Sequence, residues 1–189
     1  LYAFTDCEVS VSPNSSIIDG EKPRFLGVSE ILKINTDHTA ALLKLELEIK
    51  LDELERQWHF STLEKLFINN EMYIDFKLYS DRETLYAYLY DRFKPFKKQL
   101  LREIQDEDLH KLTQIPMIRI TRFDADKADE ALLKIEEEIQ QVKHHLANLV
   151  EFAIEDYIDL KKRFGAGRER KTEIKTFDTI SATKVIIAN

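Results

Sequence analysis

The sequence predicts a mainly α-helical fold, a long antiparallel coiled-coil hairpin capped by a small helical knob, with short β-strands at the N-terminal end. Apolar residues recur at alternating spacings of four and three in two separate stretches, which is the seam pattern of paired helices. Only 4 glycines and 4 prolines occur in 189 residues, and helix-forming residues run through the middle of the chain. Because one chain carries both stretches, we expect them to pair with each other.

The N-terminal part of the chain is expected to form short strands before the first long helix. β-Branched residues alternate over 1–26, and Asp19-Gly20 marks a turn. A short helix is expected over 28–34. Asn35 or Thr36 would then cap a longer helix running from about 38 to about 69.

Two arms carry the seam of the coiled coil. The ascending arm is 37–60, and the descending arm, 124–165, predicts a single helix about 60 Å long. Asp124 is the expected N-cap of that helix and Gly165 its left-handed terminator. The seam residues are Leu47, Leu51, Leu54 and Trp58 in the first arm, and Ile135, Ile139, Val142, Leu146, Leu149 and Ala153 in the second.

The segment between the arms, 61–123, is expected to form the knob. A capping-box spacing at Ser61–Glu64 leaves open a kink in the first helix, and a second box predicts a helix over 80–105. A short helix near 109–113 and an apolar connector over 115–121, which contains a proline, are expected to follow.

The apolar side chains of the knob have two interpretations. They would form a patch through which two copies of the chain pair, or only the knob's own core. The residues concerned are Leu109, Leu112, Ile115, Met117, Ile118 and Ile120, with Tyr86 and Tyr90 as further anchors. A basic set on the same segment is interpreted as a solvated helix face rather than a phosphate track, although DNA passing nearby would still sense it; its members are Arg92, Lys94, Lys97, Lys98 and Arg102.

Composition excludes several classes of protein and site. The net charge of −7 argues against a free-standing nucleic-acid binder. The single cysteine, Cys7, is interpreted as a small apolar strand residue; it excludes an internal disulfide and a cysteine-based zinc site, and it fits a reducing cytoplasm. No apolar run predicts a membrane span and the start predicts no secretory signal. The missing initiator methionine and the apolar run at the end suggest that both ends were cut from a larger protein.

No motif of the sequence predicts catalysis or metal binding. The five histidines lack metal-ligand spacing, and no glycine-rich phosphate loop or nucleophile elbow occurs. Three tyrosines crowd one predicted helix, at Tyr86, Tyr88 and Tyr90, and their spacing favours packing over a nucleophilic role.

Three stretches carry motifs in a fixed order. The first is Leu1-Tyr2-Ala3-Phe4-Thr5-Asp6, followed after a gap by Ile18-Asp19-Gly20 and Pro23-Arg24-Phe25-Leu26. The second covers Leu109 to Arg122, and the third is Arg163-Phe164-Gly165 with Arg168 to Ile174. Together they resemble the A subunits of the bacterial type IIA DNA topoisomerases, the gyrase and topoisomerase IV group, over almost the whole chain, and the topoisomerase IV side more closely.

The resemblance implies a division of the chain and a role. It implies the end of a tower domain at 1–36, an exit-gate knob at 61–123 between the two arms, and a return segment at 166–189. By this resemblance the fragment holds a homodimer together and gates release of the transported DNA duplex during ATP-dependent strand passage. The alternative is a structural coiled-coil adaptor that binds another protein through its knob.

The resemblance also implies what this fragment lacks. In the family the DNA-cleaving tyrosine and its assisting arginine lie upstream of the position of Leu1, so no catalytic residue is expected here. Mg²⁺ and ATP belong mainly to the B subunit, so no cofactor is expected in this fragment. The implied partners are a second copy, duplex DNA and the topoisomerase B subunit, in the cytoplasm.

Overall fold

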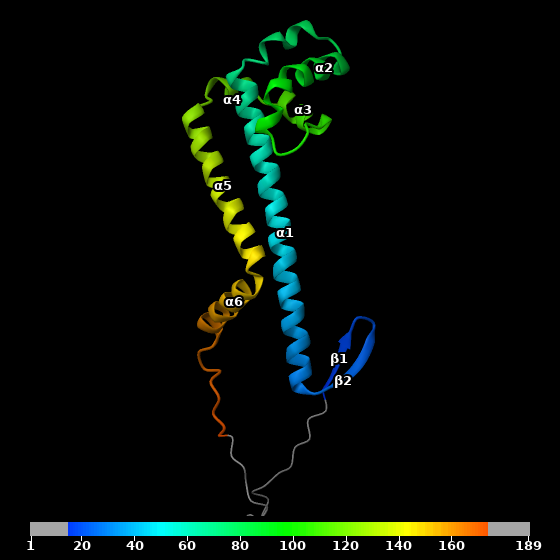
Figure 1. The fold of residues 1–189 in the computed structure, drawn as a ribbon, viewed down its shortest axis with the longest axis vertical. Coiled ribbons are helices and arrows are strands. Elements are labelled where there is room, and N and C mark those ends of the chain that lie inside the picture. Colours follow the sequence, from blue (N-terminus) through cyan, green and yellow to red (C-terminus); the bar gives the residue numbers. More distant parts are fainter. Residues whose placement is uncertain (1–14, 174–189) are drawn as a thin grey trace, which may run out of the picture. The chain divides into compact units, whose positions relative to one another are not determined.

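The computed structural model describes residues 15–173 of the chain. These residues form two strands, six α-helices and two 3-10 helices (Figure 1), so the prediction of a mainly α-helical fold is confirmed. Cys7, the Leu1–Asp6 part of the first motif stretch and the end of the return segment lie outside the described residues. Within the described part of the chain, no helix is both long and apolar enough to cross a bilayer.

The strands form a β-hairpin, as the turn at Asp19-Gly20 predicts. Strand β1, Ser15–Asp19, pairs antiparallel with β2, Lys22–Leu26, and Asp19 lies opposite Lys22. The two-residue loop has Gly20 at a φ of +66°, the left-handed conformation that a type II′ turn requires at its first central position. A side chain would be strained at this φ, so glycine sets the register of the hairpin.

The first long helix, α1, is continuous from Val28 to Asn69. The expected short helix over 28–34 and the cap at Asn35 or Thr36 are therefore wrong. The kink that the sequence left open at Ser61–Glu64 does not interrupt the helix. Thr36 does not cap, because its hydroxyl donates to the Leu32 carbonyl at 2.8 Å inside the helix. The helix begins instead after Gly27, whose backbone N–H donates to Glu30 Oε2 at 3.1 Å.

The descending arm is two helices, α5 from Ala125 to Ala147 and α6 from Leu149 to Phe164, so the prediction of a single helix is wrong. Asn148 interrupts it with φ −119° and ψ 47°. Its side-chain Nδ2 and its backbone N–H both donate to the His144 carbonyl, each at 3.0 Å. The backbone bond is the ordinary helical one, and the side chain adds a second, local donor to the same carbonyl.

Both ends of the descending arm fall where the sequence predicts them. Asp124 caps α5, because its Oδ1 accepts from Asp126 N at 3.2 Å and Lys127 N at 3.3 Å. The arm ends at Phe164, but Gly165 is not left-handed; that conformation occurs at Gly167, with φ +77°. Gly165 is required for space, since a Cβ there would lie 2.3 Å from the Lys161 carbonyl oxygen.

Residues 70–123 and the end of α1 form the head. Its elements are η1 (Ile74–Leu78), α2 (Arg82–Phe93), η2 (Lys94–Gln99), α3 (Asp106–Thr113) and α4 (Met117–Thr121). The helix predicted over 80–105 ends at Phe93, because Pro95 has no N–H to donate to the Asp91 carbonyl. The chain continues as a 3-10 helix and then as a loop to Gln105.

The chain divides into two compact units, and we describe each by itself. One holds the described residues up to Ala41 and from Ala153 onward, and it contains the hairpin. The other, Leu42–Phe152, holds the paired arms and the head. Whether the chain divides functionally at the predicted boundaries stays a prediction.

Within the second unit α5 lies beside α1 (Figure 1), and the arms run in opposite directions. Lys65 pairs with Asp129, Trp58 Nε1 donates to Glu136 at 2.9 Å, and Glu55 pairs with Lys143 at 2.9 Å. Partner numbers rise on α5 as they fall on α1, which fixes an antiparallel register. The seam cluster contains every predicted seam residue except Ala153, which is buried but falls in the other unit.

Candidate functional site on the helical head

The head is packed around its own apolar core. Leu63 and Phe67 of α1 pack with Leu89 and Phe93 of α2, and all four side chains are buried. Leu109, Leu112 and Tyr86, which the sequence analysis assigned to a contact with a second copy, belong to this core. That part of the assignment is corrected, because side chains covered by their own chain are not available to a partner.

Two of the assigned residues are well exposed on α4. Met117 is 62% exposed and Ile118 is 59% exposed, while Ile115 and Ile120 are half-buried against the head core. We call these four residues the α4 patch. An adjacent hollow is lined by Ile118, Arg119, Arg122, Phe123, Asp124, Lys127 and Ala128. Exposed apolar side chains beside a hollow are the kind of surface that protein partners cover.

A partly buried ion pair fixes the α4 patch to α1. The Arg119 guanidinium approaches the buried Glu64 carboxylate with Nε 2.5 Å from Oε1, and Nη2 donates to Oε2 at 2.8 Å. A two-point contact of this kind restricts orientation as well as distance. Together with the half-buried Ile120, this pair ties the five-residue helix α4 to the head and leaves Met117 and Ile118 exposed.

The tyrosines of α2 serve the structure of the head. Tyr90 donates to Asp106 Oδ1 at 2.7 Å, and burial together with this hydrogen bond raises the pKa of Tyr90 to about 12. Tyr88 stacks on Tyr79 at 4.8 Å between ring centroids and donates to Asp75 at 2.9 Å. Burial and that hydrogen bond raise the pKa of Tyr88. Phenols held protonated in this way are poor nucleophiles, which agrees with the packing interpretation.

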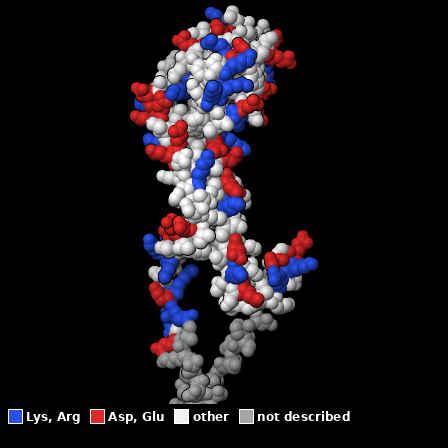
Figure 2. Space-filling view, viewed as in Figure 1, with Lys and Arg blue, Asp and Glu red and all other residues white. Residues whose placement is uncertain are grey.

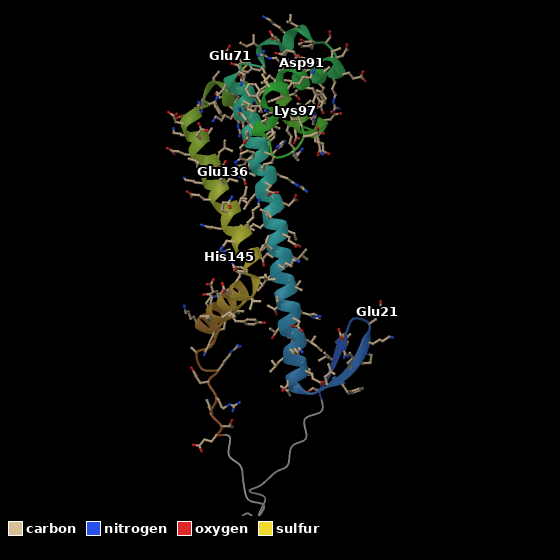
Figure 3. All side chains as sticks on the ribbon, in the orientation of Figure 1. Glu21, Glu71, Asp91, Lys97, Glu136 and His145 are labelled. Carbon is tan, nitrogen blue, oxygen red and sulfur yellow. The ribbon has the colours of Figure 1, made fainter. Side chains whose placement is uncertain are left out.

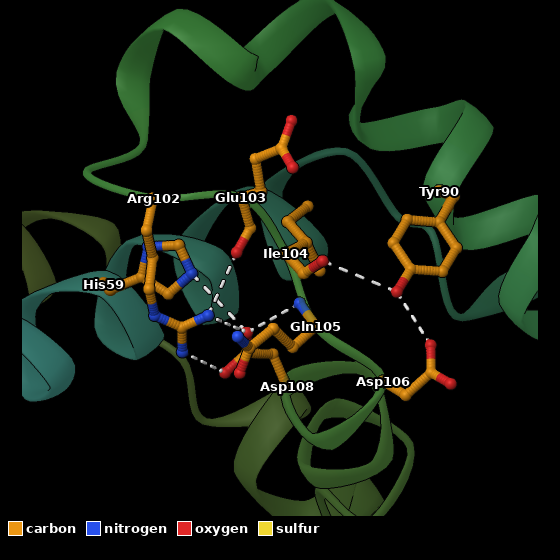
Figure 4. A network of polar contacts seen from close by, with 8 residues as sticks. All are labelled: His59, Tyr90, Arg102, Glu103, Ile104, Gln105, Asp106 and Asp108. Carbon is orange, nitrogen blue, oxygen red and sulfur yellow. Dashed lines mark hydrogen bonds and ion pairs between the residues drawn. The ribbon is translucent and has the colours of Figure 1, made fainter.

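Sequence analysis missed a buried polar network at the junction of the seam and the head (Figure 4). Asp108 accepts from Arg102 Nη1 and Nη2, both at 2.8 Å, and from the backbone N–H of Gln105 at 3.0 Å. His59 of α1 is 1% exposed and places Nε2 3.7 Å from Asp108. The capping-box spacing from Gln105 to Asp108 was a usable signal, but nothing local pairs Asp108 with His59.

The network sets the charge state of its members. Burial would raise the pKa of Asp108, but the hydrogen bonds from Arg102 and Gln105 outweigh it and lower that pKa. Burial lowers the pKa of His59 below its ordinary 6.5, the Arg102 charge adds to this, and Asp108 opposes it. The network therefore joins a neutral imidazole to a charged Asp108–Arg102 pair, and that pair ties the loop before α3 to the first turn of the helix.

The free energy of unfolding is expected to fall as the pH drops from about 6.5 toward the lower folded-state pKa of His59. In that window the unfolded chain binds a proton that the buried imidazole does not accept. One proton contributes at most about 1.4 kcal/mol per pH unit. In His59→Gln the free energy of unfolding, measured with urea, should no longer fall in this way across the range. In His110→Gln, an exposed control on α3, the fall should persist. An equal slope in both variants would contradict the assignment to His59.

Two comparisons with known proteins point to the same protein family. A family model that describes the A subunit of DNA gyrase/topoisomerase IV matches residues 1–158 of the chain. The A subunit of DNA topoisomerase 4 from Borreliella burgdorferi is 24% identical over 190 residues, an alignment that covers 100% of this chain. The chain spans 30% of the length of that relative.

Proposed function

The chain belongs to the family of DNA gyrase/topoisomerase IV A subunits, and from this premise we propose that it is the coiled-coil and exit-gate portion of a type IIA topoisomerase. In this role it holds two copies of its parent subunit together and gates release of the transported duplex during ATP-dependent strand passage. The observation that supports the role is a pair of antiparallel arms ending in a compact head with exposed Met117 and Ile118.

The proposed contact joins the heads of two copies around a two-fold axis. In such an isologous interface each α4 patch faces the same surface of the partner, so every contact occurs twice. A stable interface buries at least about 1,000 Å² in total, which is more than four apolar side chains from each copy provide. The contact must therefore extend to head side chains around the α4 patch.

Gating requires the heads to part and to close again. We describe this as a two-state interface whose open form is populated when the arms are strained by the transported duplex. The seam, with its cross-arm contacts, would carry such strain from one end of α5 to the other.

The cofactors of the assembled enzyme would come with a different polypeptide. Mg²⁺ and ATP would enter through the B subunit. Among residues 15–173 no group of three or more His, Cys, Asp or Glu side chains is arranged to hold a metal ion.

The alternative is a structural adaptor whose head binds a different protein. The two functions differ in one measurable property, because the gate needs self-association of the head and the adaptor does not. Family membership favours the gate, and the exposed α4 patch is compatible with both.

Sedimentation equilibrium over a dilution series tests the proposal on the chain itself. We expect a reversible monomer–dimer equilibrium that shifts toward dimer as the concentration rises, because exposed apolar side chains of two heads are then removed from water. A chain that stays monomeric up to about 0.1 mM would have a dissociation constant too weak for a contact of this size and would support the adaptor.

A further inference from the structure

The head carries a segment of one charge sign that the proposed gate does not use. Residues 92–102 contain five cationic side chains and no acidic one; they are Arg92, Lys94, Lys97, Lys98 and Arg102. Lys and Arg side chains gather on the head in Figure 2, and Figure 3 labels Lys97 there. The rest of the chain is acidic enough to give a net charge of −7, so this segment is a local exception.

Three of the five cations are available for an external anion. Arg102 is held by Asp108, and Arg92 donates to the Asn70 carbonyl at 3.2 Å. The side chains of Lys94 and Lys97 are 67% and 65% exposed, and their partners Asp91 and Glu103 lie at 2.8 and 4.0 Å on the surface. For Lys98 the described residues offer no ion-pair partner. Exposed pairs such as these contribute little to stability and exchange readily for another anion.

The backbone of η2 sets the spacing of these lysines. A 3-10 helix has about three residues per turn and a rise of about 2.0 Å, so Lys94 and Lys97 lie on one edge about 6 Å apart. Phosphates follow each other along a duplex strand with an axial rise of about 3.4 Å, so cations a few ångströms apart on one edge can reach phosphates of the same strand. Lys98 adds a cation on the next edge.

The segment is anchored to the head core, so the lysines are presented on a fixed element. Phe93 is buried at the start of η2, and Phe96 packs against the core between Lys94 and Lys97. Pro95 lies in the first turn of η2 and restricts its backbone.

We propose that Lys94, Lys97 and Lys98, which we call the lysine face, contact backbone phosphates of duplex DNA without reading its sequence. The inference rests on the proposed function, which brings a duplex past this part of the chain, and it assigns to the head a contact with that duplex. Phosphate contacts need mobile, exposed cations at phosphate spacing, and the lysine face supplies them.

Fluorescence anisotropy with a labelled duplex of about two helical turns tests the proposal. The test variant replaces Lys94, Lys97 and Lys98 by glutamine. The matched control replaces Lys33, Lys50 and Lys134, three exposed lysines of α1 and α5, and changes the net charge equally. Raising the salt from about 50 to about 200 mM should weaken DNA binding by both chains, and by a factor about fortyfold larger for the parent chain than for the lysine-face variant. The factor follows from three phosphate contacts, each of which adds about 0.9 to the slope of log affinity against log salt.

The outcomes separate this contact from the gate itself. A reduced affinity and salt slope in the lysine-face variant, with the control unchanged, support the proposal. The proposal is overturned if both variants lose affinity equally, or if the parent chain does not bind DNA at about 50 mM salt. It is also overturned if polyglutamate of equal charge displaces the DNA. Sedimentation of the same variants reports dimer formation independently, so loss of DNA binding with an intact dimer concerns the lysine face alone.

Discussion

Replacing Phe67 by alanine is expected to lower the free energy of unfolding of the chain by about 3–5 kcal/mol. Phe67 is fully buried in the head core. Its ring centroid lies 5.6 Å from that of Phe76 and 6.0 Å from that of Tyr73. Truncation removes the transfer free energy of the ring and leaves a cavity that the helices around it cannot fill without moving.

Urea unfolding followed by circular dichroism measures this effect. Phe25→Ala on strand β2 is the matched control, since the same side chain is exposed there. A surface change of this kind is expected to alter the free energy of unfolding by no more than about 0.5 kcal/mol. Similar losses in the two variants would show that Phe67 does not pack as described.

Ile118→Asp is expected to weaken dimerisation of the chain at least about thirtyfold, corresponding to about 2 kcal/mol. The substitution puts a carboxylate into the α4 patch, and the two-fold symmetry of the proposed contact introduces two of them together. Each would have to leave water without a partner charge, and the two would repel each other.

The control for this variant is Leu133→Asp on α5. Leu133 and Ile118 are both 59% exposed, so each substitution adds the same charge at the same degree of exposure outside the core. Sedimentation equilibrium should give a dimer for the control and monomer for Ile118→Asp, with unchanged circular dichroism in both. An equal dissociation constant in the two variants would remove the α4 patch from the contact.

The arms could be predicted from sequence because their signals are local and repeated. The four-and-three spacing from Leu47 to Trp58 and from Ile135 to Leu149 identified the residues that the structure gathers in the seam cluster. Asp124 marked the start of the second arm through its capping chemistry. Phe164-Gly165 marked its end, although Gly165 is not in the left-handed conformation that was expected there. The break at Asn148 was missed, because the apolar period continues through it unchanged.

The head was harder to predict because its contacts join residues that are distant in sequence. Apolar periodicity shows that one side of a helix is covered, but it does not say whether the same chain or a partner covers it. Leu109 and Leu112 were therefore assigned to a partner contact, whereas they lie in the head's own core. The link between His59 and Asp108 has no sequence signal at all, since it arises only when α1 and α3 pack together.

Trp58 is the only tryptophan in the 189 residues, and it lies in the seam with its indole N–H bonded to Glu136. The chain therefore contains a natural optical reporter at one point between α1 and α5. Intrinsic emission from this indole would shift toward longer wavelength if the two helices separated and water reached the ring. Opening of the arms can thus be followed in real time without attaching a dye.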